Sequence, residues 1–482
     1  MIGDIVAIPW VVVLIVLPLM GGMACFLFPT ISKLLGLMTA LAIFTAVGGL
    51  SWQLVEEGAQ RYAIGGWGAS LGIDLYADGL SLLMLVMAAL VGLGVSVYSS
   101  GYFSRDKANH FWPLWLFLWG ALNALFLSAD LFNLYVTLEL LGLAAVALVA
   151  LAGGRGALTS AMRYLLVSLL GSLFYLLGVV LLYHSFGSLD IAILAQRVEP
   201  SPAVWAAVGL MSVGLLLKTA LFPMHFWLPA AHASAPAPVS ALLSALVVKA
   251  SFYILLRLWL EVFPQTNTAF SQLLGLLGAA AVLWGGLMAL RQTRLKMLIA
   301  YSTVAQLGYL FLAFPLATSC AWTGMLYLLF SHALAKAAMF MAAGNILRYG
   351  GHDRIADLDQ VAQRLPLTLA AFSLAGVSIM GLPPSGGFVA KWLLLEASMN
   401  SGQWWWAIVL ILGGLLAAAY VFRVIGYAFT QAELPQEAGV VPARMEWTAL
   451  VLAFVAILLG FISPAAFELM GIGAPFGVGC AG

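Results

Sequence analysis

The chain has 482 residues, of which 63% are hydrophobic and only 8% are charged, and its mean hydropathy is +1.06. Soluble domains normally carry about 25% charged residues, so this composition excludes a soluble enzyme, a nucleic-acid-binding module and a disordered chain. The net charge of +1 points to no particular partner. The sequence therefore predicts an all-α polytopic membrane protein.

Fourteen apolar segments are each long enough, at about 20 residues, to cross the bilayer as a helix. Their centres fall near residues 18, 43, 88, 119, 141, 171, 216, 249, 280, 305, 334, 382, 416 and 457. No basic residue precedes the stretch from Ile8 to Phe28, unlike a secretory signal peptide, so we expect it to remain as the first span. The longest polar connection, from Glu56 to Asp78, predicts a small β-hairpin at the membrane surface.

The distribution of the 20 basic residues between the loops predicts the orientation of the chain. Loops that follow even-numbered spans hold only Arg61 and Arg197. Loops that follow odd-numbered spans hold Lys33, Arg105, Lys107, Arg155, Arg291, Arg294, Lys296, Arg348, Arg354, Arg364 and Arg444. Because cytoplasmic loops carry the excess of Lys and Arg, we expect a multi-pass protein of the cell (inner) membrane with both termini on the outer side.

Two predicted spans contain breaks. Pro223 removes a backbone donor within the seventh span, and the run Gly-Leu-Pro-Pro-Ser-Gly-Gly at 381–387 interrupts the twelfth. A lone Pro often only kinks a packed helix, but broken helices at matching places are typical of inverted-repeat transporters with an ion path near the midplane. We expect three N-terminal helices at 1–110, a first repeat of helices 4–8 at 111–262, a second of helices 9–13 at 263–431 and a C-terminal helix at 432–482.

Ionisable residues inside spans are rare, because each costs about 2.5–3.5 kcal/mol on insertion scales. Glu139 lies at the middle of the fifth span. The basic residues placed inside spans are Arg163, Lys218, Lys249, Arg257, Lys336, Lys391 and Arg423. Lys218 and Lys249 lie about ten residues, or about 15 Å, from the ends of their spans, whereas a Lys stem reaches only about 6 Å towards the interface. Snorkelling or packing stays the preferred interpretation for Arg163, Arg257 and Arg423.

One mid-span carboxylate cannot neutralise several lysines, which argues against a set of static ion pairs. An ammonium group buried without an acidic partner gives up its proton readily, as a proton relay requires. His332 and Lys336 are four residues apart on one helical face. The predicted relay consists of Glu139, Lys218, Lys249, His332, Lys336 and Lys391. Secondary candidates are His225 and His232, for which packing and proton access are both open, and Arg163, which begins the sixth span beside the helix of Glu139.

The sequence predicts neither a metal nor a cofactor. Cys25, Cys320 and Cys480 are too far apart for a metal or iron–sulfur motif and too few for a disulfide framework. His225 and His232 lack a neighbouring Cys or carboxylate that would complete a metal site. Gly-rich phosphate-binding motifs are absent, so we expect the energy to come from an ion gradient or from partner subunits.

Several segments resemble the antiporter-like proton-translocating subunits of Mrp-type cation/proton antiporters, the membrane arm of respiratory complex I and membrane-bound hydrogenases. The resemblance runs from about Asp78 to Thr430 and is strongest over 218–249, with support from 300–309, 331–340 and 381–391. It implies fourteen helices in two inverted repeats with helices 7 and 12 broken. It also implies relay roles for Glu139, Lys218, Lys249, His332, Lys336 and Lys391. The sequence around Leu221 to Pro229 looks most like the D-type subunits of Mrp antiporters.

Together these features predict a proton-translocating subunit of a multi-subunit Na⁺/H⁺ antiporter, which catalyses no reaction alone and acts with other membrane subunits on protons and, through them, Na⁺. The alternative is a proton-pumping subunit of NADH:quinone oxidoreductase (complex I) or of an energy-converting hydrogenase, whose partners would carry the cofactors. A solute carrier or an inert scaffold is a third possibility, which the ordered mid-span charges disfavour.

Overall fold

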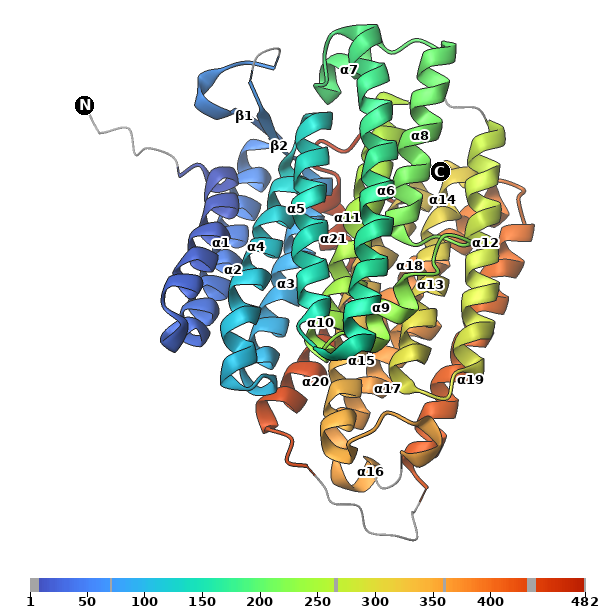
Figure 1. Cartoon of the computed structure of the whole chain (residues 1–482). Helices are drawn as coiled ribbons and strands as arrows, with labels where there is room; N and C mark the ends of the chain where they lie inside the picture. Colours follow the sequence, from blue (N-terminus) through green and yellow to red (C-terminus); the bar gives the residue numbers. More distant parts are fainter. Residues whose placement is uncertain (1–7, 70–71, 264–267, 359–360, 431–438, 481–482) are drawn as a thin grey trace.

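The computed structural model describes residues 8–69, 72–263, 268–358, 361–430 and 439–480, and it is a bundle of long helices (Figure 1). Within these ranges, twelve helices are long and apolar enough to cross a membrane, and a bent pair would make a thirteenth. The predicted twelfth span is split into two halves, of which neither is long enough alone. The all-α polytopic fold is therefore confirmed, and each of the fourteen predicted segments falls on a helix or a helix pair.

The N-terminal part contains three long helices and the predicted hairpin. Its elements are α1 (Trp10–Leu27), α2 (Ser32–Glu57), β1 (Gln60–Ala63), β2 (Asp74–Ala77) and α3 (Gly79–Tyr102). The two strands pair antiparallel, with Gln60 opposite Ala77. Asp78 fixes the start of α3, because its side chain accepts a 2.9 Å hydrogen bond from the backbone N–H of Ser81 while the Ser81 hydroxyl accepts one from the N–H of Asp78.

The next group of helices ends in a continuous helical span with two π-helical turns. Its elements are α4 (Arg105–Leu127), α5 (Leu131–Ala150), α6 (Gly154–Phe186), α7 (Ile191–Arg197), α8 (Pro202–Thr219), α9 (Leu228–Ser234), α10 (Ala237–Leu242), η3 (Leu243–Val247), α11 (Val248–Arg257) and η4 (Leu258–Val262). The predicted break in the seventh span is confirmed, since α8 stops at Thr219 and helix resumes only at Leu228.

The remaining elements follow a similar order. They are α12 (Thr268–Arg291), α13 (Leu295–Phe311), α14 (Ala313–Leu316), α15 (Ser319–Gly350), α16 (Val361–Arg364), α17 (Pro366–Met380), α18 (Gly386–Asn400), α19 (Trp405–Ala428), α20 (Ala443–Leu458) and α21 (Ser463–Met470). The predicted break in the twelfth span is also confirmed, because residues 381–385 separate α17 from α18. The division into two inverted repeats stays a prediction.

Two spans lie at the centre of the bundle, enclosed by the others. The apolar windows of Ala237–Val262 and of α15 are wholly buried, whereas α1, α2 and α19 are buried over only a third of theirs. A helix that is apolar on every side is typical of such an enclosed position. Polar side chains on these two helices therefore face protein rather than lipid.

The two ends of the bundle differ in their loops (Figure 1). The hairpin and α7 lie at one end, which we call the outer end, and α16 lies at the opposite, inner end (Figure 1). Arg61 of the hairpin forms ion pairs with Asp74 and with Asp190, the residue that caps α7, so the loops of the outer end are tied together.

Candidate functional site: a chain of buried ionisable side chains

Glu139 and Lys218, two members of the predicted relay, form an ion pair. The Lys218 ammonium, in the last turn of α8, lies 3.1 Å from Oε1 of Glu139 on α5. The Ser172 hydroxyl of α6 donates a hydrogen bond to the same carboxylate oxygen. The Lys218 side chain is only 7% exposed, so its charge is balanced by this carboxylate rather than by water.

Small residues let α6 and α8 approach closely enough to place Lys218. A Cβ added to Gly171 of α6 would lie 2.9 Å from the backbone oxygen of Gly214 on α8 and 3.0 Å from Cγ of Lys218. The end of α8 is held by Trp227 in the break, whose indole N–H donates a 3.0 Å hydrogen bond to the backbone oxygen of Leu217. The sequence at the break therefore positions the lysine as well as ending the helix.

Lys249 lies on the central span immediately after the first π-helical turn. It is fully buried, and its ammonium donates a 2.9 Å hydrogen bond to the backbone oxygen of Ala245 within that turn. π-helical turns are common at functional sites because they shift the regular backbone pairing. Among the described residues, no carboxylate lies within 4 Å of this lysine.

His332 and Lys336 lie one turn apart on α15, the other enclosed helix. Lys336 is fully buried and donates to the backbone oxygen of Ile299, at 3.2 Å, and to the hydroxyl of Ser302, both on α13. His332 is 2% exposed, and its Nε2 has no hydrogen-bond partner among the described residues. A buried ring nitrogen without a protein partner marks a place for a water molecule.

Lys391 lies across the break of the twelfth span. Its ammonium donates hydrogen bonds of 2.8 and 3.3 Å to the backbone oxygens of Ile379 and Met380, at the end of α17. It also lies 4.5 Å from the ring centre of Tyr309 on α13. The carbonyl end of a helix carries partial negative charge, so the end of α17 favours a cation at this position.

These groups follow one another through the middle of the bundle. The hydroxyls of Thr219 and Ser251 form a 2.9 Å hydrogen bond between α8 and α11, the helices of Lys218 and Lys249. A cavity of about 10 Å³ beside Lys218 is lined by Ser168 and Ser251, which is room for about one water molecule.

The series of ionisable side chains continues beyond this cavity. Lys249 lies close enough to Lys336, and His332 close enough to Lys249, Lys336 and Lys391, for these groups to repel one another electrostatically when both are protonated. The six residues predicted as a relay thus lie in one chain of neighbouring polar groups, which extends from α5 to α18.

The three secondary candidates are placed differently. His232 of α9 is fully buried, stacks on Phe340 at 4.8 Å, and has no hydrogen-bond partner for either ring nitrogen among the described residues. His225 stacks on Phe222 within the break at 5.5 Å. Arg163 is exposed on α6, and its guanidinium does not pair with Glu139 within 4 Å. Of the three, only His232 adjoins the chain, through its interaction with Lys336.

The structure corrects the placement of Lys296, which the sequence assigned to a cytoplasmic loop. Lys296 is only 2% exposed in the first turn of α13, and its ammonium donates to the backbone oxygen of Ala235. It interacts electrostatically with His232. Hydropathy could not reveal the burial of Lys296, because it assigns a lysine directly before an apolar segment to a loop whether the side chain points outwards or inwards.

Lys296 also forms part of the wall of a cavity at the inner end of the bundle. The cavity has a volume of about 670 Å³ and is lined by Tyr102, Lys107, Ser234, Lys296 and Arg348, among others. All of these residues lie near helix ends on the inner side of the bundle. A wide polar space at the inner end therefore reaches Lys296, which in turn adjoins His232.

Arg257 was expected to be an anchor or a packing partner, and it is a buried packing partner. Its guanidinium forms two hydrogen bonds with the Asp78 carboxylate, at 2.5 and 2.6 Å, and one of 2.5 Å with Glu261. Bidentate pairing of this kind fixes orientation as well as charge. The cluster joins the start of α3 to α11, so it is a structural contact of the outer end.

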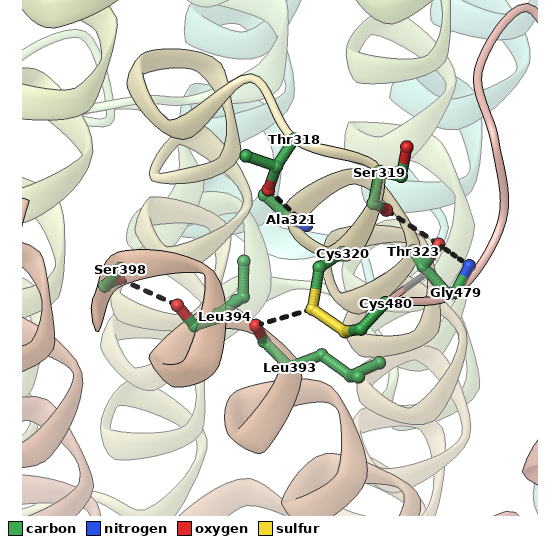
Figure 2. Close-up of a disulfide and its surroundings, with 10 residues drawn as sticks. All are labelled: Thr318, Ser319, Cys320, Ala321, Thr323, Leu393, Leu394, Ser398, Gly479 and Cys480. Atoms are coloured by element: carbon green, nitrogen blue, oxygen red, sulfur yellow. Dashed lines mark hydrogen bonds between the residues drawn. A yellow bond between two sulfur atoms is a disulfide. The ribbon is translucent and has the colours of Figure 1, made fainter. Parts of the chain in front are cut away.

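Two of the three cysteines are joined. Cys320, at the start of α15, forms a disulfide with Cys480 in the C-terminal tail (Figure 2). The Cys320 sulfur lies 3.3 Å from the backbone oxygen of Leu393 on α18, and the N–H of Gly479 donates a 2.9 Å hydrogen bond to the Thr323 hydroxyl (Figure 2). Cysteine count alone could not indicate a pair 160 residues apart.

One group of side chains has the spacing to hold a metal ion within the described ranges, namely Cys320, Glu396 and Cys480. Its two sulfur atoms are bonded to each other, so neither is a thiolate. Since zinc and similar ions bind the thiolate form, the oxidised group does not supply a metal site.

Comparison with known proteins identifies the family. Residues 128–417 match the family model described as NADH:quinone oxidoreductase/Mrp antiporter, transmembrane. Residues 65–112 match the model for the N-terminus of chain 5 of NADH-ubiquinone oxidoreductase (complex I).

Similar full-length proteins come from both branches. The N-type subunit of the NADH-quinone oxidoreductase of Desulforudis audaxviator is 36% identical over 480 residues, which cover 94% of this chain and 95% of the relative. The D-type subunit of the Na(+)/H(+) antiporter of Alkalihalophilus pseudofirmus is 27% identical over 437 residues, covering 89% and 88%. The fold also matches a chain in the structure of the Mrp complex from a Dietzia species, with a TM-score of 0.88, 23% identity and 96% of each chain covered. The chain belongs to the transmembrane family shared by NADH:quinone oxidoreductases and Mrp antiporters.

Proposed function

We propose that the chain is a proton-translocating subunit of a multi-subunit cation/proton antiporter, and that protons move along the chain of buried side chains from Glu139 to Lys391. The observation that carries the proposal is the Glu139–Lys218 pair at a helix break, because it is the one carboxylate contact in a series of otherwise carbonyl-bound lysines. The similarity to the D-type antiporter subunit and to the Mrp complex supports the assignment.

In this mechanism, the carboxylate of Glu139 holds Lys218 in its charged form. When Glu139 gains a proton or moves away, the Lys218 ammonium loses its favourable partner and releases a proton. The Thr219–Ser251 hydrogen bond and the small adjacent cavity offer a path for that proton to Lys249. Each later lysine responds to the charge of its neighbour, so the residues titrate as a coupled set.

The inner cavity supplies an access route to the relay. Protons would pass from this cavity to Lys296, then to His232, and would join the relay at Lys336. Both His232 nitrogens lack protein partners among the described residues, which leaves them available to water. These surroundings of His232 support a role in proton access rather than in helix packing.

We further propose that the inner end faces the cytoplasm and that the outer end, with both termini, faces the opposite side. The distribution of Lys and Arg supports this orientation. The disulfide supports it independently, because disulfides persist in oxidising compartments and the predicted orientation places both Cys320 and Cys480 outside.

The informative variant is Lys218→Arg, since arginine keeps the positive charge but does not deprotonate in a protein. We expect Na⁺-driven proton flux in inverted membrane vesicles to slow on the order of a hundredfold, the scale of a positioned proton-transfer group. Arg163→Lys, at an exposed position of α6, is the matched control. Wild-type flux from Lys218→Arg, in a fully assembled complex, would rule out the relay.

A second candidate function is a proton-pumping subunit of an NADH:quinone oxidoreductase. The 36% identity to the N-type oxidoreductase subunit over nearly the whole chain favours it. Purification of the native complex separates the two candidates: small membrane subunits alone indicate an antiporter, whereas Cys-rich subunits that carry iron–sulfur clusters indicate a redox complex. In the second case, the Lys218→Arg test is repeated with NADH in place of the Na⁺ gradient.

A further inference from the structure

An apolar groove lies on the outside of the bundle between α2, α3 and α20, and no relay residue lines it. Its volume is about 400 Å³. The walls include Phe44 of α2, Val97 of α3 and Val451 of α20, and the first and last of these are 37% and 54% exposed. Gly94 of α3 lets α3 and α20 pack closely along the groove, since a Cβ there would lie 2.8 Å from Leu452.

One basic residue lines the inner end of this groove, and a second lies near it. Arg444 lies in the first turn of α20 and lines the groove, and Lys33 lies at the start of α2, close enough for the two cations to interact electrostatically. Both side chains are exposed, and in the described part of the chain neither has a carboxylate within 4 Å. Two neighbouring cations without an acid favour an anion between them.

The length of the groove matches one leaflet of a bilayer. From Arg444 to Val455, the wall residues of α20 are eleven positions apart, or about 16 Å along a helix. Half of the hydrocarbon core measures about 15 Å. Trp447, which is 54% exposed beside Arg444, is typical of the membrane interface. The apolar walls therefore match the length of one acyl chain, from the headgroup level to the midplane.

We propose that this groove binds a glycerophospholipid with an anionic headgroup. One acyl chain lies between α3 and α20, and the phosphate lies between Lys33 and Arg444. In the orientation proposed above, the lipid comes from the cytoplasmic leaflet, where anionic lipids are enriched. The site is separate from the relay, so the proposal is the same whether the chain belongs to a respiratory complex or to an antiporter complex.

The test uses the purified complex, reconstituted with phosphatidylglycerol and phosphatidylcholine, with the retained lipid counted by extraction and mass spectrometry. We expect Lys33→Gln with Arg444→Gln to weaken phosphatidylglycerol retention about fivefold for each cation removed, and to leave phosphatidylcholine unchanged. The matched control is Arg155→Gln with Arg364→Gln, which removes the same charge from exposed positions of the same end outside the groove. Equal retention by the two double variants would overturn the proposal.

A photo-reactive benzoylphenylalanine at Val451 identifies the occupant directly in the intact complex. An adduct with phospholipid supports the proposal, and an adduct with another protein subunit overturns it. Val451→Trp, which fills the groove without changing charge, is expected to lower retention of both lipids. Antiport by the Lys33/Arg444 variant is measured alongside, so loss of lipid is distinguished from failure of the relay, which the Lys218→Arg test addresses separately.

Discussion

The buried lysines are held by the backbone rather than by acids, with Lys218 as the exception. Lys249, Lys336 and Lys391 each donate to backbone oxygens near a π-helical turn, on a neighbouring helix or at a helix break. A carbonyl oxygen accepts a hydrogen bond from an ammonium group but carries no full negative charge, so it stabilises the charged form less than a carboxylate does. In the proposed relay, such lysines change protonation when a neighbouring charge moves, whereas Lys218 responds to the charge of Glu139.

Lys296 provides a residue-scale prediction. Lys296→Arg keeps the charge but cannot release a proton, whereas Lys296→His keeps proton exchange in a smaller side chain. We expect the Arg variant to slow proton flux on the order of tenfold to a hundredfold and the His variant to retain more of it, with a shifted dependence on the pH of the inner side. Flux is measured in inverted vesicles.

The comparison at Lys296 separates proton access from packing. Lys107→Arg, at the rim of the same cavity, is the control because Lys107 is exposed. Equal slowing by the Arg and His variants would mean that Lys296 only supports the fold. The relay proposal would survive that result, since it rests on the Glu139–Lys218 pair.

Helix breaks position Lys218 and Lys391, two residues of the proposed relay. The break after α17 requires Gly381, which has φ of +82°, and a Cβ at this position would lie 2.6 Å from Cδ of Lys391. The glycine therefore adopts the positive φ that the turn requires, and it also leaves room for the Lys391 side chain over the end of α17. The sequence predicted both breaks because Pro and Gly act locally, and local signals need no knowledge of the partner helix.

Gly381→Ala tests this element. Gly402 is the matched control, because it also has positive φ, at +71°, but a Cβ there would meet nothing within 4 Å. Both variants carry similar backbone strain of about 1 kcal/mol, so the difference between them isolates crowding against Lys391. We expect Gly381→Ala to reduce proton flux severalfold and Gly402→Ala to leave it near the wild-type value. Similar flux in the two variants would mean that the position of Lys391 is not critical.

At the scale of the whole molecule, the sequence predicted the spans, the hairpin and the central charges, because a bilayer imposes simple rules on length and polarity. Long-range contacts were not predictable in this way. The Cys320–Cys480 bond, the burial of Lys296 and the Asp78–Arg257 cluster join residues that are distant in the chain. Each depends on how helices pack, and packing leaves no local signature in a chain that is apolar throughout.

The disulfide gives a prediction at this scale. Without reductant, the denatured protein should react with one maleimide at Cys25, and after reduction with three. Cys480→Ser should free Cys320 for labelling and lower the melting temperature of the purified complex, since a native disulfide typically contributes about 2–4 kcal/mol. Three reactive thiols in the protein isolated without reductant would contradict the bond and remove its support for the proposed orientation.

The position of this bond also orders the steps of biogenesis. Cys320 lies at the start of α15, whereas Cys480 follows α20. In the proposed orientation, oxidation must therefore wait until the last long helix has entered the membrane and the tail has crossed it. Until then, Cys320 stays a free thiol beside α18. Formation of the bond is therefore a marker of completed insertion. A chain that stalls before α20, or that inserts in the opposite direction, would keep the Cys320 thiol. Pulse-labelling with thiol trapping would measure when this last step of assembly occurs.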